Sequence, residues 1–478
     1  MLRTTLLASV ATAACLTIPG FAFAQAKPAT TAAAAKDVDV SEIVVTGSRI
    51  RRDTFDAPLP IASVSAEAIR ASGNVILGDV LMEQPMINAN NNAQNTSSTL
   101  FNAGEARADI RGLGSNRTLV LMDGRRHVNG DAASPAVDLN MIPSLMIDRV
   151  EVQPGGVSAI YGSEAIAGVV NLIMKKSYDG LQIDVQGGIA QPGDGSEFVG
   201  GVIWGKKFMD DRLSVVIGGE YARQNPIYQV DRADAGLYPG IRRNSATGVL
   251  VQNVLPASRS ATSPYATFQI RPDAGVSLAN PFGTNNPIAA TIDVRNPTQV
   301  VLLSPACALR TVNPTCQDPS LFYSAIYNEL QNETMRGSVR GYTEYKMSDH
   351  MKVFGEASFA RVDAFAVFQP AFSNTAGGGT LPVSLKGDNG FLQGTTAADQ
   401  QLRGFITGAG LPLTSATSIN VGKFYQEFGG RNVYTRRHTE RFVGGMEGDF
   451  DFADRNFHWD WYAQLGRLTG TTQSFGVP

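Results

Sequence analysis

The stretch RFVGGMEGDFDF, residues 441–452, is followed by ADRN (453–456) and then by FHWDWYAQLGR (457–467). In the first stretch, large apolar residues and acidic residues fall on opposite sides of an extended chain: Phe442, Met446, Phe450 and Phe452 against Glu447, Asp449 and Asp451. The third stretch alternates in the same way. A period of two is typical of a strand with one apolar and one polar face. Together the three stretches predict a β-hairpin with a short polar turn.

The same pattern recurs along the second part of the chain, with short turns at MDDR (209–212) and MSDH (347–350). Between the hairpins lie long segments rich in Gly, Pro and Asn, residues 224–334 and 362–437. Short turns at one end and long connections at the other are typical of an outer-membrane β-barrel. Two structureless loops of that length would be unusual in a soluble domain. Strands are expected near 180–190, 197–208, 213–223, 335–346, 351–361, 440–452 and 457–468.

These strands do not add up to a closed barrel. The number is odd, and each strand is close to the roughly 9–11 residues that a tilted membrane strand needs. An open edge in lipid would leave backbone groups unpaired at several kcal/mol each. The last ten residues, TGTTQSFGVP, lack the terminal strand with a final aromatic residue that completed barrels have. We therefore interpret residues 178–478 as a partial barrel, truncated at the C-terminus, unless the long segments hold further strands.

The first residues predict export. Arg3 precedes an apolar run, and Ala22-Phe23-Ala24 is a small-x-small cleavage site, so residues 1–24 are expected to be a signal peptide. A lipoprotein signal ending at Cys15 is disfavoured, because Thr12 stands where a large aliphatic residue is usual. The net charge of −3 is nearly balanced and argues against a nucleic-acid partner.

Cys307 and Cys316 remain after removal of the signal peptide, in CALRTVNPTC. In an oxidising compartment this spacing predicts a disulfide bond that closes a small loop. Such a ring would stabilise the fold by about 2–3 kcal/mol. The alternative is a pair of free thiols; a metal site is less favoured, since no histidine is nearby.

No enzyme signature is present. The four histidines have no metal-ligand spacing; they are His127, His350, His438 and His458. Neither a G-x-S-x-G nor an H-E-x-x-H motif occurs. We therefore expect no catalytic residue, no metal and no cofactor.

Residues 53–177 predict a small mixed α/β domain. Residues 65–85 have helical spacing in two pieces, divided at Gly73-Asn74. Short β-like runs follow at 107–114, 117–124, 147–156 and 168–176. The glycines in these runs predict tight turns rather than a phosphate site, because the Lys-Ser/Thr of a P-loop is missing. They are Gly112, Gly114, Gly124, Gly155, Gly156, Gly162 and Gly168.

Two segments of the chain, residues 41–50 and the run that begins at Leu77, resemble a known protein family. SEIVVTGSRI (41–50) resembles a TonB box, which we place at residues 42–50. The segment running from LGDVLMEQPMI through RADIRGLGSNRTLVLMDGRR to YGSEAIAGVVNLIMKK resembles the plug of TonB-dependent outer-membrane receptors. The likeness runs nearly continuously over residues 42–177. It implies a plug within a barrel of roughly 22 strands, in the outer membrane of a Gram-negative bacterium.

The resemblance also implies partners. A β-branched segment on a flexible leader (25–41) is suited to adding a strand to a partner's sheet, so Glu42, Ile43, Val44, Val45, Thr46 and Gly47 are expected to bind TonB of the energy-transducing inner-membrane complex. The alternative is that this segment is a strand of the plug's own sheet. Outer-membrane lipid, the barrel assembly machinery and a small-molecule or oligomeric ligand are the other expected partners.

The resemblance further implies contacts between plug and barrel. Arg111, in the "IRG" motif, matches the first of two plug arginines that bind barrel glutamates in the family. Pro154 stands where the second is expected, and Arg149 with Glu151 is a candidate substitute pair; an ordinary ion pair is the alternative. The Asn-rich loop 88–102 is expected at the plug apex. There Asn90, Asn91, Asn92 and Phe101 are candidate ligand contacts, unless the loop is simply solvated.

The expected function is therefore import of a scarce ligand with inner-membrane energy. The leader is too short for the extra periplasmic domain of a signal-transducing receptor. A passive porin, an adhesin or a non-functional truncated fragment are the remaining alternatives. The substrate stays open among siderophores, cobalamin, oligosaccharides and peptides.

Overall fold

The computed structural model describes most of residues 61–475. Outside the description are residues 1–60 and 476–478, and internally 75, 89–102, 156, 233–236, 244–249, 257–265, 273–287, 294, 304–326, 328, 374–382, 409 and 454.

The N-terminal part, here called the mixed domain (residues 61–176), is built on a five-stranded sheet in the order β1-β4-β5-β2-β3. Strands β2 and β5 are parallel and the other neighbours are antiparallel. The strands are β1 (Ala62–Ser65), β2 (Thr118–Met122), β3 (Arg125–Arg126), β4 (Ile147–Pro154) and β5 (Gly168–Met174).

Short helices pack on this sheet. They are α1 (Ala66–Ala71), α2 (Leu77–Met82), α3 (Ser158–Tyr161), and the 3₁₀ turns η3 (Ser115–Arg117), η4 (Leu139–Met141), η5 (Ser144–Met146) and η6 (Ser163–Ala165). The expected break between two helical pieces is confirmed, since Gly73 has φ +74° after α1. Leu77 and Leu81 of α2 are fully buried in a core that includes Ile110. The expectation of a β-strand at residues 107–114 was wrong, because these residues form only a single β-bridge, between Ile110 and Ile87.

The expected turn glycines are confirmed where they are described, except for Gly168, which is the first residue of β5. Six have a positive φ, which a residue with a Cβ adopts only with strain: Gly112, Gly114, Gly124, Gly155, Gly162 and Gly168. At Asp123-Gly124, both residues have a positive φ, of 52° and 74°. This is the backbone of a tight two-residue hairpin turn.

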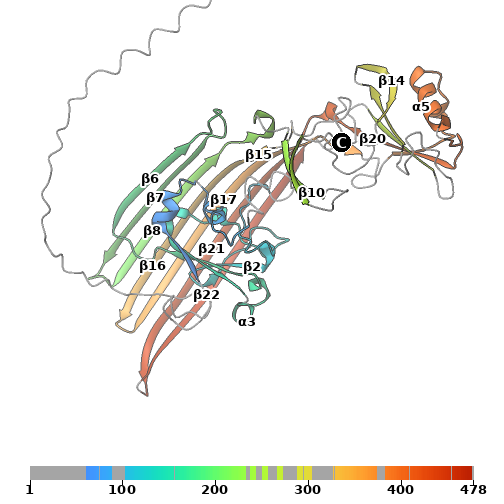
Figure 1. Ribbon diagram of the computed structural model, residues 1–478. Helices are drawn as coiled ribbons and strands as arrows, with labels where there is room; N and C mark the ends of the chain where they lie inside the picture. The colour runs from blue at the N-terminus through green and yellow to red at the C-terminus, as the bar shows by residue number, and fades with distance from the viewer. Residues whose placement is uncertain are drawn as a thin grey trace, which may run out of the picture. The chain divides into compact units, whose positions relative to one another are not determined.

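The second part of the chain forms a seven-stranded sheet, here called the long sheet, in the order β22-β21-β17-β16-β8-β7-β6 (Figure 1). All neighbours are antiparallel. The strands are β6 (Gly180–Gly188), β7 (Glu197–Phe208), β8 (Leu213–Gln224), β16 (Glu333–Ser348), β17 (Met351–Phe368), β21 (Arg431–Phe452) and β22 (Arg455–Phe475). They correspond one to one to the seven expected strands.

Two details differ from the expectation. All strands but β6 are longer than 9–11 residues, from 12 in β7 and β8 up to 22 in β21. Residues 469–475 are not irregular but continue β22, paired with β21 as far as Asn432↔Phe475. Among the described residues, β6 and β22 do not pair with each other, so the sheet is not closed into a barrel.

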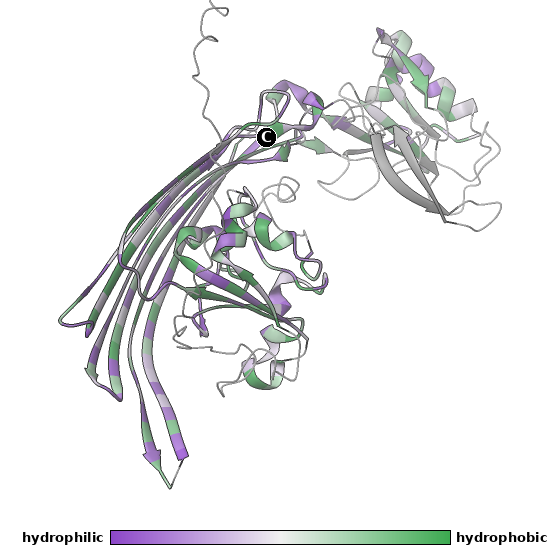
Figure 2. Ribbon diagram, turned by 60° about the vertical axis from the view of Figure 1, so that its left-hand side comes forward, coloured by the Kyte–Doolittle hydropathy of each residue, from purple (hydrophilic) through white to green (hydrophobic). Residues whose placement is uncertain are grey.

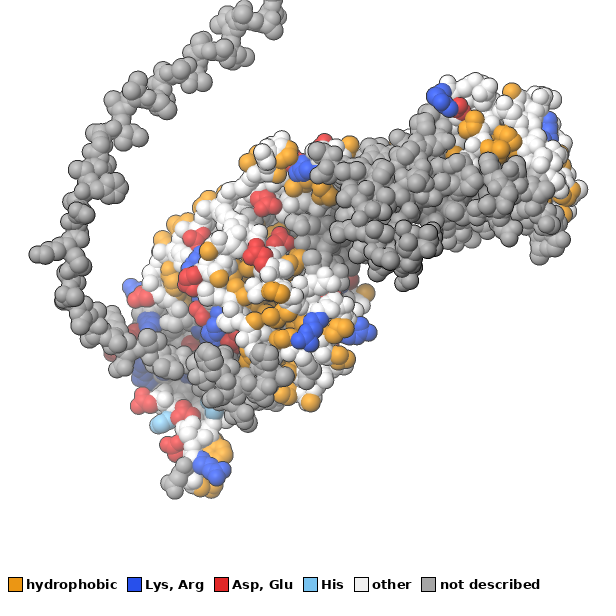
Figure 3. Space-filling view, in the orientation of Figure 1, with side chains coloured by type: hydrophobic (Ala, Val, Ile, Leu, Met, Phe, Trp, Pro, Cys, Tyr) orange, Lys and Arg blue, Asp and Glu red, His pale blue; other side chains and the backbone are white. Residues whose placement is uncertain are grey.

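The two faces of the long sheet differ in polarity. Along each strand apolar and polar residues alternate, visible as the change from green to purple in Figure 2. Phe359, Phe442 and Val339 are exposed on the face turned away from the mixed domain. Glu220, Glu356 and several arginines are buried on the opposite, inner face. On the side drawn in Figure 3, acidic and basic side chains are interspersed, in line with the net charge of −3.

The long segments between the hairpins are not structureless. They hold a second sheet, β14-β13-β12-β20-β18 with β19 on β20, and α5 (Ala397–Gly408), whose Leu402 and Ile406 are buried against β12 and β20. The remaining elements are β9 (Ile227–Tyr228), η7 (Gln229–Asp231), β10 (Leu237–Arg243), β11 (Leu250–Pro256), β12 (Thr267–Pro272), β13 (Ile288–Asp293), β14 (Asn296–Leu302), β15 (Glu329–Gln331), β18 (Phe372–Ser373), β19 (Val383–Lys386), η9 (Gly390–Gln393), β20 (Thr417–Phe424) and η10 (Gln426–Phe428).

None of the helices in the described ranges is both long and apolar enough to cross a membrane.

Candidate functional site between the mixed domain and the long sheet

Most residues singled out from the sequence lie outside the described residues. These are the expected TonB-binding segment Glu42–Gly47, the expected ligand contacts Asn90, Asn91, Asn92 and Phe101, and the cysteine pair Cys307 and Cys316. The signal peptide (1–24) and the leader (25–41) lie outside them as well.

The three candidate contact residues of the mixed domain are described. Arg111 has φ 57° and an exposed side chain, and its backbone N–H donates to Met86 O at 2.8 Å. In the described part of the chain, its guanidinium forms no hydrogen bond or ion pair with the long sheet. Arg149 Nε and Glu151 Oε1 lie 2.9 Å apart, both on β4. The structure therefore brings Arg149 and Glu151 together, but places Arg111 elsewhere.

The mixed domain instead meets the sheet through the β2–β3 hairpin. Asp123 at its tip accepts a hydrogen bond from the Met174 amide at 3.0 Å, which fixes the side chain. Its other carboxylate oxygen accepts from Arg340 Nη2 of β16 at 3.3 Å. Gly124 N donates to Asn171 Oδ1 at 3.0 Å and holds the turn against β5. The hairpin thus presents an acid to an arginine of the sheet.

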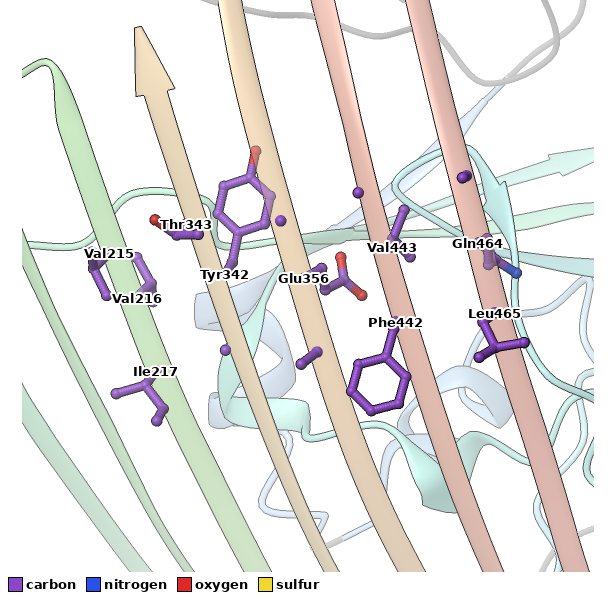
Figure 4. Close-up of a pocket in the computed structure, with 15 residues that line it drawn as sticks. Val215, Val216, Ile217, Tyr342, Thr343, Glu356, Phe442, Val443, Gln464 and Leu465 are labelled. Carbon is purple, nitrogen blue, oxygen red and sulfur yellow. The ribbon is translucent and has the colours of Figure 1, made fainter.

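Arg340 belongs to a buried group of charges on the inner face. Glu356 of β17 lies between Arg340, whose Nη2 donates to it at 2.9 Å, and Arg441 of β21, which also donates to it. Figure 4 shows Glu356 projecting between β16 and β21. Arg441 Nη2 donates in addition to Gln464 Oε1 at 3.1 Å. Both guanidinium groups are fully buried, so each depends on its carboxylate partners.

The same hairpin adds aromatic contacts. The Arg125 guanidinium lies 4.4 Å from the ring centre of Phe354 and 5.0 Å from that of Tyr462, both on the sheet. These distances are within the range of cation–π attraction. Gln464 Nε2 donates to Arg126 O at 2.9 Å. Arg441 Nη1 of β21 also donates to Met122 Sδ of β2 at 3.5 Å, so the hairpin contacts β16, β17, β21 and β22.

A second contact centres on Arg437 of β21. Its Nη1 donates to Ala103 O at 3.1 Å and lies 3.5 Å from Glu105 Oε1, while its Nη2 lies 3.3 Å from Asp138 Oδ2. Glu105 also pairs with Arg107. Burial raises the pKa of Glu105 to about 7, with Arg437 acting in the opposite direction. This contact is polar and almost fully enclosed.

A third contact lies at η5. Glu220 of β8 accepts hydrogen bonds from Ser144 Oγ at 2.6 Å and from the Leu145 amide at 3.0 Å. Its other oxygen lies 2.6 Å from Arg336 Nη2 of β16. Here the sheet supplies the acid and the mixed domain supplies neutral donors.

No group of three or more His, Cys, Asp and Glu side chains among the described residues could hold a metal ion. Burial and the nearby Arg441 lower the pKa of His127 to about 4, so this histidine is neutral at pH 7. A hollow of about 680 Å³, drawn in Figure 4, lies where Gly341, Gly355 and Gly444 carry no side chain on the sheet. Its lining is mostly apolar.

Comparison with known proteins identifies the mixed domain. Residues 53–169 match the family described as the TonB-dependent Receptor Plug Domain. These residues are a TonB-dependent receptor plug domain. From here on the mixed domain is called the plug. The polar contacts described above are therefore contacts between a plug and a β-sheet.

Solved receptors are similar to most of this chain at low identity. A variant of the ferric enterobactin receptor PfeA from Pseudomonas aeruginosa is 15% identical, with 87% of this chain and 46% of that chain covered and a TM-score of 0.39. BauA, the ferric preacinetobactin receptor from Acinetobacter baumannii, is 14% identical, with 89% and 49% covered and a TM-score of 0.40. The chain spans about half the length of these receptors.

Sequence reasoning missed most residues of the interface. Gly124 was expected in a tight turn, but its neighbour Asp123 was not singled out as a contact residue, and neither were Glu105, Asp138, Arg340 and Arg437. One signal was available: the arginines come in two pairs spaced four apart within strands, so each pair shares a face. The pairs are Arg336 with Arg340 and Arg437 with Arg441.

Proposed function

We propose that this protein is an outer-membrane receptor that imports a scarce ligand, such as a siderophore or an oligosaccharide, into the periplasm with energy delivered through TonB. The observation that carries the proposal is the placement of the plug. It is bound through buried charged contacts to the polar inner face of a sheet whose other face exposes apolar side chains.

The polarity of the sheet supports a place in the outer membrane. Transmembrane barrels turn apolar residues to lipid and polar residues to the lumen, with alternation along each strand. The exposed face of the long sheet carries large apolar side chains along most of its strands, and they include Ile183, Val202, Ile217, Val339 and Phe442. The short turns at 209–212, 347–350 and 453–456 all join strands at the same end.

The chemistry of the interface supports a plug that can be moved. Asp123–Arg340, Asp138–Arg437 and Glu220 with Ser144 are ion pairs or hydrogen bonds. Such polar contacts can be exchanged for water when the plug is displaced. The apolar contacts of Ile203 and Val216 with the plug core would have to separate as well. Under this proposal, a pull on the N-terminal segment shifts the plug and opens a path along the inner face.

Binding of TonB to residues 42–47 provides the test. Proline lacks the N–H that strand addition needs, so Val44→Pro should weaken binding of the TonB periplasmic domain at least tenfold, roughly the effect of losing one or two backbone hydrogen bonds. Ala33→Pro in the leader is the matched control and should leave binding unchanged. Affinity would be measured by biolayer interferometry on the purified protein, with its level in the membrane checked separately. Equal affinity of Val44→Pro and the control would refute the assignment of this segment.

A further inference from the structure

Three polar side chains follow one another on the inner face of β21. Thr435, Arg437 and Thr439 are two residues apart, so they form one strip along the strand. They are 1%, 5% and 4% exposed. The strip presents a hydroxyl, a guanidinium and a second hydroxyl.

Every hydrogen bond and ion pair that the described structure gives these three side chains is made with the plug. Thr435 Oγ1 donates to Ala103 O at 3.0 Å, and Thr439 Oγ1 to Met141 Sδ at 3.2 Å. Arg437 contacts Ala103 O, Glu105 and Asp138. Displacement of the plug therefore removes the partners of the whole strip at once.

The other three buried arginines of the inner face differ in this respect. Arg336 is paired with Glu220, and Arg340 and Arg441 with Glu356, all on the long sheet. These arginines keep a carboxylate when the plug leaves. Arg437 alone among the four loses both of its acidic partners.

The neighbours of the strip on the sheet cannot replace these acids. Across β17, Thr435, Arg437 and Thr439 are paired with Ala364, Val362 and Ala360. Across β22, Arg437 is paired with Gly470. These small or apolar neighbours carry no charge and leave space beside the guanidinium.

We propose that Thr435, Arg437 and Thr439 form an oxyanion subsite on the inner wall, occupied at rest by Glu105 and Asp138 of the plug and, during transport, by a carboxylate or phosphate group of the ligand. The transport role rests on the function proposed above, whereas the binding property of the strip does not. At rest, Glu105 and Asp138 of the plug therefore occupy the position that the anionic group of the ligand takes during transport.

The hydrogen-bond donors of the strip favour a carboxylate or phosphate group as the ligand. A guanidinium has five N–H donors and no acceptor, and the Nε–H of Arg437 is buried and donates no hydrogen bond to any described residue. Two hydroxyl donors flank it. A group with several acceptor oxygens and a negative charge satisfies these donors and compensates the buried cation. A neutral sugar would satisfy the donors and leave the charge uncompensated.

The test restores the missing anion from solution. Glu105→Gln with Asp138→Asn removes both plug carboxylates and leaves Arg437 without a counter-charge. In detergent at pH 8, 10 mM inorganic phosphate should raise the thermal midpoint of this variant by about 2–4 °C relative to chloride of equal ionic strength. The unmodified protein should show no such rise, because its own acids occupy the strip.

Three controls make the outcome specific. Addition of Arg437→Gln to the double variant should abolish the rise, and 10 mM glucose should produce none. Asp123→Asn should not respond to phosphate, because Arg340 keeps Glu356. A rise that persists without Arg437, or equal rises with glucose or in Asp123→Asn, would overturn the proposal, as would no rise in the double variant.

If the double variant does not fold, Asp138→Asn alone takes its place, with a smaller rise that again requires Arg437. Because these measurements need neither TonB nor uptake, their failure is distinguishable from failure of the Val44→Pro test.

Discussion

Glu105 shows how a single buried residue couples the plug to pH. Its carboxyl is almost fully buried between Arg107 and Arg437, and Asp138 and Asp131 lie close to it. Three acids thus face two guanidinium groups. Because the nearby charges do not fully compensate burial, the pKa rises from the ordinary value of 4.5 to about 7.

A raised pKa on an acid fixes the sign of the pH dependence. Between about pH 4.5 and 7, the folded protein holds the proton on Glu105 and the unfolded chain releases it. This contribution to stability is complete below pH 4.5 and is lost as the pH rises through 7. We expect the free energy of unfolding to fall by roughly 1–3 kcal/mol between pH 5 and pH 8 from this residue.

The measurement is denaturant unfolding at both pH values, with Glu105→Gln as the comparison. Glutamine does not titrate, so the decline should be smaller in this variant by the stated amount. Exposed Glu440 offers a matched control, and Glu440→Gln should retain the full decline. The same decline in Glu105→Gln as in the unmodified protein would exclude Glu105 as its source.

At the scale of elements, β5 depends on the backbone of its first residue. Gly168 has φ +147°, and a Cβ placed there would lie 2.4 Å from Gln153 O and 2.8 Å from Ile110 Cδ1. Both strain and overlap oppose any side chain at this position. Gly168→Ala should destabilise the plug by about 2–4 kcal/mol.

Thermal or denaturant unfolding would check this value. Gly337→Ala in β16 is the control, since no atom lies within 4 Å of its Cβ position and its φ is not positive. It should change stability by less than about 0.5 kcal/mol. If Gly168→Ala were as mild as the control, the close approach of β5 to β4 would be wrong.

The elements also show what the sequence could and could not predict. The seven long strands were predictable because a period of two, sustained over ten or more residues, has few alternatives. Residues 107–114 also mix apolar and polar side chains, but Arg111 and Gly112 adopt a positive φ, which interrupts the extended conformation there. Helix α5 and the second sheet were missed because these elements are short and lie within long segments that are rich in Gly, Pro and Asn as a whole.

The interface was harder to predict than the strands. Alternation places Arg340 and Arg437 on the inner face, but it does not say which plug residue meets them. Asp123 and Arg340 are 217 residues apart in the chain, and their contact depends on how the plug sits against the sheet. A resemblance to a family's arginine motif pointed to Arg111, whereas two of the described contacts join acids of the plug to Arg340 and Arg437 of the sheet.

At the scale of the whole molecule, the proposal requires lipid on the exposed face of the long sheet. Val339 and Met347 of β16 are almost equally exposed, at 47% and 46%. They are separated by eight residues, roughly 27 Å along the strand. Val339 is near the middle of the strand, and Met347 adjoins the short turn at 347–350.

In a membrane these two positions should respond differently to a charge. Val339→Arg places a guanidinium near the centre of the bilayer and should cost about 2–4 kcal/mol, whereas Met347→Arg near the interface should cost about 0–1 kcal/mol. The measurement is urea unfolding of the protein in phospholipid vesicles. In water, both positions are surface sites of equal exposure, so an arginine should have the same small effect at each. A depth-dependent penalty thus separates a membrane-embedded sheet from a soluble one, and equal effects would contradict the outer-membrane assignment whatever the ligand.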